Sequence, residues 1–291
     1  MSEQLAIESQ EQSNDRLRRF AEHTGLEIAD HQQRLQALAS LESEQFIDLL
    51  SVGAGILRGE KRFSRWDEDT AEGSVVQSAV MGEDLVPPEE SHKHFAEFFN
   101  RLKDQMAAEP EAVNKYAVEL YFAIVGSHMF PDGNGRVART MYHLVKDGKL
   151  PSEQAIFTRT PGVSEASKLN NQEAVKQLLD REGLSYKYIN DFQAREDYDP
   201  EVKGFQSGGL SQTLKYIAAK RVLESSGAWD PDNPPKLVGL KKWSETDKSA
   251  FTEAYKDVRD EWFYAYIDAA AEYEGFYSER LSEPAELPQA A

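Results

Sequence analysis

Apolar residues recur every three or four positions along most of the chain, which is the spacing of amphipathic helices. The first such pattern fills an N-terminal helical region, which we place at residues 1–60. Prolines followed by acidic residues predict two further helix starts, at Pro88 and at Pro110. The helix after Pro110 is apolar almost all round as far as Val125, so we expect it to be the central helix of the core.

One stretch has a different pattern. Between Val75 and Val86, β-branched residues lie on both sides of a turn that contains Gly82. This arrangement predicts a short β-hairpin, and the alternative interpretation is a plain loop.

Helical spacing returns in the C-terminal part, after a break over residues 197–209 that is rich in Asp, Pro, Gly and Ser. A stripe of aromatic and apolar residues then follows one helix face: Phe251, Tyr255, Val258, Trp262, Tyr266, Ala270, Tyr273 and Tyr277. We favour packing of this stripe against the core of the protein. The alternative is a surface for a partner helix or for a second copy of the chain.

Composition narrows the choice of partners and compartment. The formal net charge of −18 speaks against a nucleic-acid or anionic-membrane partner, because either would require a basic surface. The chain has no cysteine, which excludes disulfides and thiolate chemistry. It lacks a signal-peptide pattern at its start and any apolar run of about 20 residues, the length that spans a bilayer. We therefore expect a cytoplasmic protein, with export as an effector by a non-classical route left open.

The chemistry-bearing side chains are concentrated in residues 127–139, between the predicted central helix and the next one. Gly133 and Gly135 flank Asn134, and such a turn exposes consecutive backbone N–H groups that bind anions. Arg136 and Arg139 share a face at the start of the following helix, where a cation opposes the helix dipole unless an anion lies between them. A polyphosphate would be such an anion.

Two further residues complete this candidate site. Asp132 offers the carboxylate oxygen that Mg²⁺ prefers, and Mg²⁺ also takes phosphate oxygens as ligands. His128 is suited to accept a proton near neutral pH, and Phe130 between them is expected to fix the loop by its apolar side chain. The alternative is an ordinary glycine-rich helix start with a satisfied histidine and solvated arginines.

Residues 128–139 resemble the signature of the Fic family, His-x-Phe-x-(Asp/Glu)-Gly-Asn-Gly-Arg-x-x-Arg, at every specified position. The one departure is Met129, where the family usually has proline. The resemblance implies a mainly α-helical, Fic-type bundle with a short β-hairpin flap, and helical N- and C-terminal extensions. It places the catalytic core at residues 61–197 and the C-terminal helical region at residues 198–291.

The resemblance also implies an activity, which is transfer of AMP from ATP to a Ser, Thr or Tyr hydroxyl of a target protein, with Mg²⁺ as cofactor. His128 would be the base, Asp132 would hold the metal, and Arg139 would meet the γ-phosphate. The remaining phosphate contacts would come from Gly133, Asn134, Gly135 and Arg136. In the family the β-hairpin docks the target as an extended strand, so the segment between Val75 and Val86 is the expected target site.

Other functions stay open at this point. Some relatives transfer phosphate or phosphocholine with the same loop, but the phosphorylating branch has lysine at the position of Gly135. A non-catalytic adaptor or toxin-like binding protein is a further alternative, against which the intact His128 speaks.

Many Fic proteins are inhibited by a helix that reads (Ser/Thr)-x-x-x-Glu-(Gly/Asn), and the chain has no full match to it. Serine is followed by glutamate four residues later at Ser40, Ser64, Ser249 and Ser282, and the next residue is never Gly or Asn. The pair Ser40 and Glu44 lies in a helical stretch ahead of the core. We expect no built-in inhibitor, and any inhibitor to be a separate small protein.

Overall fold

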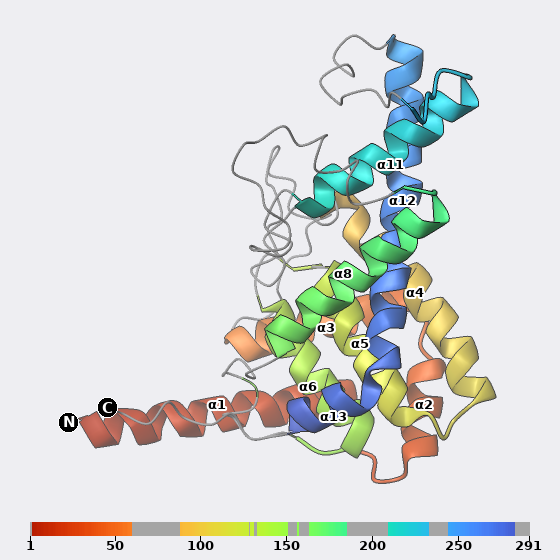
Figure 1. Ribbon diagram of the computed structural model, residues 1–291. Helices are drawn as coiled ribbons and strands as arrows, with labels where there is room; N and C mark the ends of the chain where they lie inside the picture. Colours follow the sequence, from red (N-terminus) through yellow and green to blue (C-terminus); the bar gives the residue numbers. More distant parts are fainter. Residues whose placement is uncertain are drawn as a thin grey trace. The chain divides into compact units, whose positions relative to one another are not determined.

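A computed structural model of the chain describes residues 2–59, 88–127, 129–130, 133–150, 156, 163–184, 209–232 and 244–282. These residues are mostly helical and include no strand, which confirms the mainly α-helical fold class (Figure 1). The predicted hairpin between Val75 and Val86 lies outside the described residues. The helices are α1 (Ser2–Thr24), α2 (His31–Ala39), α3 (Ser43–Arg58), α4 (Pro88–Ala108), α5 (Val113–Ser127), α6 (Asn134–Asp147), α8 (Val163–Arg181), α11 (Gly209–Ser225), α12 (Glu245–Glu272) and α13 (Glu274–Ser282).

The chain forms two compact units that are not consecutive in sequence. The first unit comprises Met1–Val76, Val86–Ala166 and Ala270–Ala291, and the second comprises Gln77–Leu85 and Ser167–Ala269. Because α12 ends beyond Ala269, its last residues and the whole of α13 belong to the first unit. The three-part division that follows the order of the sequence stays a prediction.

Helix α5 is the centre of the first unit, as its apolar composition predicted. Every side chain from Tyr116 to Ser127 is buried. Helices α4, α6 and α13 pack against α5, while α2 contacts both α4 and α6, and α1 packs on α3. Helix α4 begins at Pro88 as expected, and its apolar face, which includes Phe95, Phe98 and Phe99, is fully buried. The sequence therefore places the helix that leads into residues 127–139 deep in a core.

Helix α6, which follows that segment, is fixed at its far end by a buried arginine from α2. Gly148 ends α6 with a positive φ of 61°, and a Cβ there would lie 2.1 Å from the carbonyl oxygen of Ile28. Arg34 donates to the α6 carbonyls of Val145 (3.0 Å) and Lys146 (2.8 Å), and to those of Ile28 and Ala29. The last carbonyls of a helix lack intrahelical partners, so this guanidinium satisfies them.

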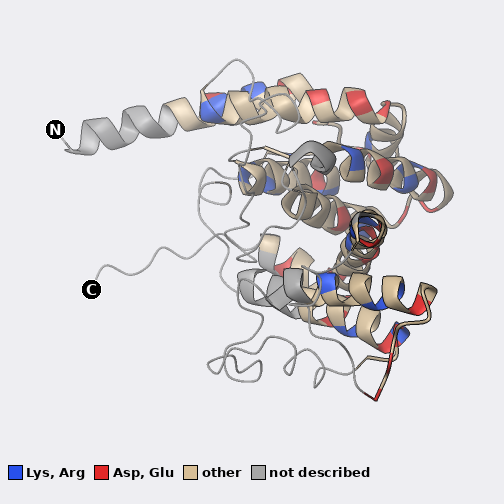
Figure 2. Ribbon diagram, turned by 90° about the horizontal axis from the view of Figure 1, so that it is seen from above, with Lys and Arg blue, Asp and Glu red and all other residues tan. Residues whose placement is uncertain are grey.

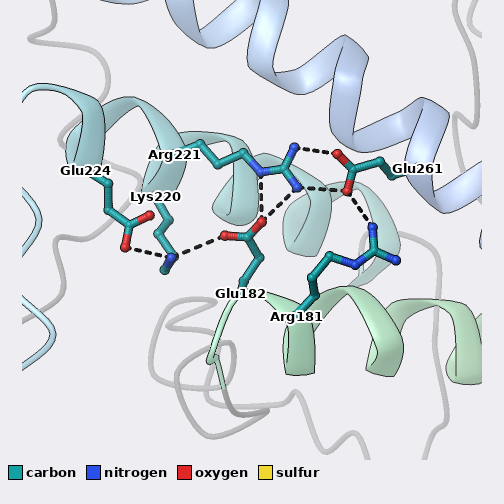
Figure 3. A network of polar contacts seen from close by, with 6 residues as sticks. All are labelled: Arg181, Glu182, Lys220, Arg221, Glu224 and Glu261. Atoms are coloured by element: carbon teal, nitrogen blue, oxygen red, sulfur yellow. Dashed lines mark hydrogen bonds and ion pairs between the residues drawn. The ribbon is translucent and has the colours of Figure 1, made fainter.

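Within the second unit, α8, α11 and α12 are joined by a network of charged side chains (Figure 3). Glu261 of α12 accepts hydrogen bonds from Arg221 of α11, both at 2.8 Å, and from Arg181 of α8 at 3.1 Å. Arg221 also donates a hydrogen bond to Glu182 at 2.8 Å. The carboxylate of Glu182 lies 3.2 Å from the ammonium of Lys220. Figure 2 shows that charges of both signs are interspersed along the described helices. The large negative net charge is therefore compatible with local ion pairs.

The aromatic stripe of the C-terminal part is largely buried. Trp262 and Tyr266 are fully buried in the second unit, where the Trp262 indole donates to Asn171 at 2.8 Å. Tyr277 is buried in the first unit and contacts the ring of Phe122 on α5 edge-on, at 4.5 Å between centroids. The stripe is interrupted at Tyr273, which is 53% exposed and separates α12 from α13. Packing therefore explains most of the stripe, over two helices instead of one.

No described helix is both long enough and apolar enough to span a membrane.

Candidate functional site

The candidate site lies where α5 gives way to α6, as the sequence indicated. Helix α5 ends at Ser127 and α6 begins at Asn134, and the two helices pack along one another (Figure 1). The structure describes residues 127, 129–130 and 133–139 of the segment. His128 and Asp132 lie outside the described residues, so their roles as base and metal ligand stay predictions.

The loop between the helices is fixed by two buried apolar side chains and one buried amide. Met129 and Phe130 are completely buried. The Asn134 side chain accepts a hydrogen bond from the Phe130 N–H at 3.1 Å and donates one to the Phe130 carbonyl at 2.6 Å. Phe130 thus fixes the loop as expected, whereas the Asn134 side chain stabilises the loop itself. A contribution of Asn134 to an anion site would come from its backbone N–H.

The start of α6 has the geometry of an anion site. Gly133 is the N-cap residue and has a positive φ of 88°, which disfavours any residue with a Cβ. Its carbonyl accepts the first two helical hydrogen bonds, from Arg136 N–H (2.9 Å) and Val137 N–H (3.0 Å). The N–H groups of Asn134 and Gly135 precede these bonds, and no side chain caps the helix. The first turn of α6 has no acidic residue. The helix dipole therefore favours a bound anion here.

The two signature arginines are half-buried near this helix start. The guanidinium of Arg139 donates two hydrogen bonds to the carbonyl of Ile156, at 2.8 and 2.6 Å. Tyr121 of α5 lies close enough for the charge of Arg139 to lower the pKa of its phenol. A Cβ on Gly135 would lie 3.3 Å from Arg139 Nη1, so Gly135 leaves room for this guanidinium.

Tyr121 and Ile156 are site residues that sequence reasoning missed. Tyr121 is buried among the other apolar residues of α5 and reads as a core position. Ile156 contributes only its carbonyl, which any residue type has. Burial raises the pKa of the Tyr121 phenol and the nearby Arg139 charge opposes this rise. The phenol is therefore neutral at physiological pH and offers its oxygen as an acceptor.

A third arginine side chain passes close to the turn. A Cβ on Gly133 would lie 3.9 Å from Cδ of Arg58, the last residue of α3. No sequence motif links Arg58 to the segment, because helix packing alone brings α3 beside α6.

The described residues contain no group of three or more His, Asp or Glu side chains that could hold a metal ion. The expected Mg²⁺ ligand, Asp132, is not among them. What the structure does describe is a helix start, a glycine turn and two guanidiniums, which together favour a bound anion.

A buried helix pair that presents a glycine turn and guanidiniums at a helix start has features that favour a bound anion such as phosphate. Residues 31–145 match the model of the Fic/DOC family, and this match includes the signature. The match supports a protein of the Fic family. The match supports a transferase of the Fic type. No curated protein and no solved structure matches the chain.

Proposed function

We propose that the protein transfers AMP from ATP to a Ser, Thr or Tyr hydroxyl of a target protein and releases pyrophosphate. The observation that carries the proposal is the start of α6. It combines a positive-φ glycine cap, N–H groups ahead of the first helical bonds and two arginines, with no acidic residue in its first turn. Two cations at the positive end of a helix dipole are unfavourable alone and are explained by a polyphosphate.

The reaction follows from the residues of the signature. His128 takes the proton from the target hydroxyl, whose oxygen then bonds to the α-phosphorus of ATP. The bond from the α-phosphorus to the oxygen of the β-phosphate breaks, and pyrophosphate leaves with that oxygen. Arg136, Arg139 and the N–H groups at the start of α6 hold the phosphates and stabilise the charge that develops on them. Asp132 would hold Mg²⁺, which neutralises phosphate charge.

Gly135 favours AMP transfer over phosphate transfer. The phosphorylating branch of the family has lysine at this position. In this chain a Cβ at position 135 would already lie 3.3 Å from Arg139 Nη1, and a lysine would add a second positive charge beside the guanidinium. The AMP-transferring arrangement therefore suits the observed position of Arg139.

The target would bind as an extended segment along the residues between Val75 and Val86, by addition of a strand to a hairpin. This docking site is part of the proposal and rests on the sequence alone.

The test uses ATP labelled at either the α- or the γ-phosphate, with Mg²⁺ and cell-extract proteins as acceptors. We expect protein-bound label from α-labelled ATP and none from γ-labelled ATP. Label from the γ-position alone would identify phosphate transfer, and label from neither would favour a non-catalytic binding protein. Intact-mass measurement of a labelled acceptor should show the addition of one AMP.

Two variants assign the roles. His128→Ala should abolish transfer and change ATP affinity by no more than about 3-fold, because the base contacts the hydroxyl and not the phosphates. Arg136→Ala should weaken both ATP binding and turnover, since it removes a phosphate contact. Transfer by His128→Ala, or unchanged ATP affinity in Arg136→Ala, would contradict the assignment.

A further inference from the structure

An arginine outside the signature reaches the turn at the start of α6. Arg58 is the last residue of α3, and it is half-buried. Its Cδ lies 3.9 Å from the position that a Cβ on Gly133, the N-cap residue of α6, would occupy. The guanidinium follows Cδ directly in the side chain. The packing of α3 on α6 therefore brings a third positive charge beside this turn.

Positive charge gathers at this helix start. The N-terminus of a helix carries a partial positive charge of its own, because its first N–H groups lack intrahelical partners. The first turn of α6 contains Arg136 and no acidic residue. Nη1 of Arg139 would lie 3.3 Å from a Cβ on Gly135, so a second guanidinium is also close. Arg58 adds a third one from another helix, and such a group of like charges is stabilised by a bound anion.

The end of α3 offers a structural alternative for Arg58, since a cation in the last turn of a helix interacts favourably with the helix dipole. A second arginine lies at the same place. Gly59 is the C-cap of α3, and a Cβ there would lie 2.9 Å from Nη2 and 3.1 Å from Cζ of Arg16 on α1. The two arginines thus share a helix end, and of the two it is Arg58 that lies beside Gly133.

We propose that Arg58 is a further phosphate-binding residue, which contacts the phosphate chain of the nucleotide from α3 while the signature arginines contact it from α6. This inference rests on the proposed function, because it takes the start of α6 to bind ATP. Guanidinium and phosphate form strong, charge-assisted hydrogen bonds. The role of Arg58 is to bind phosphate, and it takes no part in proton transfer.

The test needs variants of both arginines at the end of α3. Arg58→Gln removes the charge and keeps a polar side chain, while Arg58→Lys keeps the charge and removes the planar guanidinium. Arg16→Gln is the matched control, because it removes one positive charge from the same helix end. Arg136→Ala reports on the phosphate site itself.

Calorimetry in the presence of Mg²⁺ should compare the affinities of ATP and of inorganic triphosphate for the wild type and each variant. Inorganic triphosphate has the phosphate chain without the nucleoside, so it isolates contacts to phosphate. Urea unfolding of each protein shows that the compared variants are folded.

We expect Arg58→Gln to weaken the binding of ATP and of triphosphate by about 10-fold each, the effect of one hydrogen bond between charged groups. Arg58→Lys should weaken both by about 3-fold, because an ammonium keeps the charge but not the two parallel donors. Arg16→Gln should bind both ligands within about 2-fold of the wild type, since a charge without a phosphate contact is screened by salt.

Three results would overturn the inference. If Arg136→Ala weakens ATP binding but Arg58→Gln binds ATP as well as Arg16→Gln does, Arg58 has the structural role only and the proposed function stands. If neither Arg136→Ala nor Arg58→Gln weakens ATP binding, the start of α6 is not the phosphate site and the proposed function fails as well. Weaker binding of ATP with unchanged binding of triphosphate would mean that Arg58 does not contact phosphate.

The test holds even if Arg58→Gln does not fold. The comparison then passes to Arg58→Lys, whose weaker binding of both ligands supports the inference and whose unchanged affinity contradicts it.

Discussion

Two arginines of the first unit donate to backbone carbonyls, yet their surroundings give them different tasks. Arg34 is 2% exposed and donates to four carbonyls at the end of α6 and in the chain before α2. Arg139 is half-buried near the start of α6 and donates to the carbonyl of Ile156. Arg34 thus has the contacts of a structural cation, while Arg139 has those of a cation held near a surface where a ligand can reach it.

We predict that Arg34→Ala lowers the free energy of unfolding by about 3 kcal/mol or more, since several buried carbonyls lose a charged donor. Burial lowers the pKa of Arg34, and Asp147 and Asp30 oppose this change, so the group stays charged. Arg34→Lys should recover little, because an ammonium cannot span all four carbonyls. Urea unfolding measures both variants.

Arg18→Ala is the control for that prediction. Arg18 is an exposed arginine of α1 that pairs with Asp15 and Glu22 on its own helix. Exposed pairs of this kind contribute little to stability, so the unfolding midpoint should stay close to that of the wild type. Equal stability of Arg34→Ala and Arg18→Ala would contradict the structural role of Arg34.

Local sequence pattern identifies some of these residues and not others. The glycine turn and the two signature arginines are close in sequence, so spacing alone predicts that they form one candidate site. The hydrogen bond of Arg34 to Val145 spans 111 positions, and no local pattern encodes it. The Tyr121 contact was hidden because a tyrosine in an apolar helix is most simply explained by packing.

At the scale of helices, the spacing of apolar residues predicts that a helix is present more reliably than it predicts where the helix ends. Helix α4 begins at Pro88 as predicted, whereas α5 begins at Val113 and not at the predicted Pro110. The C-terminal stripe was predicted as one helix, but the chain breaks at Tyr273 and continues as α13. Apolar residues keep their helical spacing across the break, so the sequence pattern does not reveal that the helix ends there.

Helix α13 is held on the first unit by contacts at the end of α6. Lys146 donates to the carbonyl of Ser278 at 3.3 Å, and the Tyr142 hydroxyl donates to the same carbonyl at 3.2 Å. His143 contacts the backbone of Leu281 and lies 3.7 Å from Asp147. The attachment of α13 thus includes a buried, titratable imidazole.

We predict that His143 makes the stability of the protein depend on pH. Burial lowers the pKa of His143 below its ordinary value of 6.5, with a smaller lowering from Lys146, while Asp147 and the Leu281 backbone oppose this change. The unfolded chain then binds the proton more readily than the folded chain does. The stabilisation that comes from the neutral imidazole is therefore fully present above pH 6.5 and is progressively lost as the pH falls below that value.

His143→Gln removes the titrating group and tests this prediction. The difference in free energy of unfolding between the wild type and His143→Gln should narrow as the pH is lowered from about 7.5 to 5. The reason is that only the wild type has an imidazole whose protonation favours the unfolded chain. Thermal or urea unfolding across that range measures it. A difference that stays constant with pH would show that His143 does not contribute.

At the scale of the whole molecule, the question is whether the site is inhibited by the chain itself. The sequence suggested Ser40 and Glu44 as a pair in one helical stretch, and the structure corrects this. Helix α2 ends at Ala39 and α3 begins at Ser43, and Glu42 and Gln45 form a capping box at the start of α3. Ser40 and Glu44 therefore lie on either side of a helix break and not on one inhibitory helix.

Of the other pairs with this spacing, Ser249 and Glu253 are exposed on α12, where Glu253 pairs with Lys256 at 3.4 Å. Glu68 and Glu286 lie outside the described residues. The absence of a full inhibitory motif from the sequence thus remains the basis for expecting regulation by a separate small protein.

We predict that the purified chain transfers label from α-labelled ATP without any activating substitution, and that Glu44→Gly and Glu68→Gly leave the rate within about 2-fold of the wild type. The reason is that neither glutamate belongs to a complete inhibitory motif, and Glu44 lies in the first turn of α3, beyond the helix break that follows Ser40. Glu253→Gly is the control, since it removes a helical glutamate of the same spacing and carries a similar loss of helix propensity. A silent wild type that Glu44→Gly or Glu68→Gly activates, while Glu253→Gly does not, would show that inhibition is built into the chain.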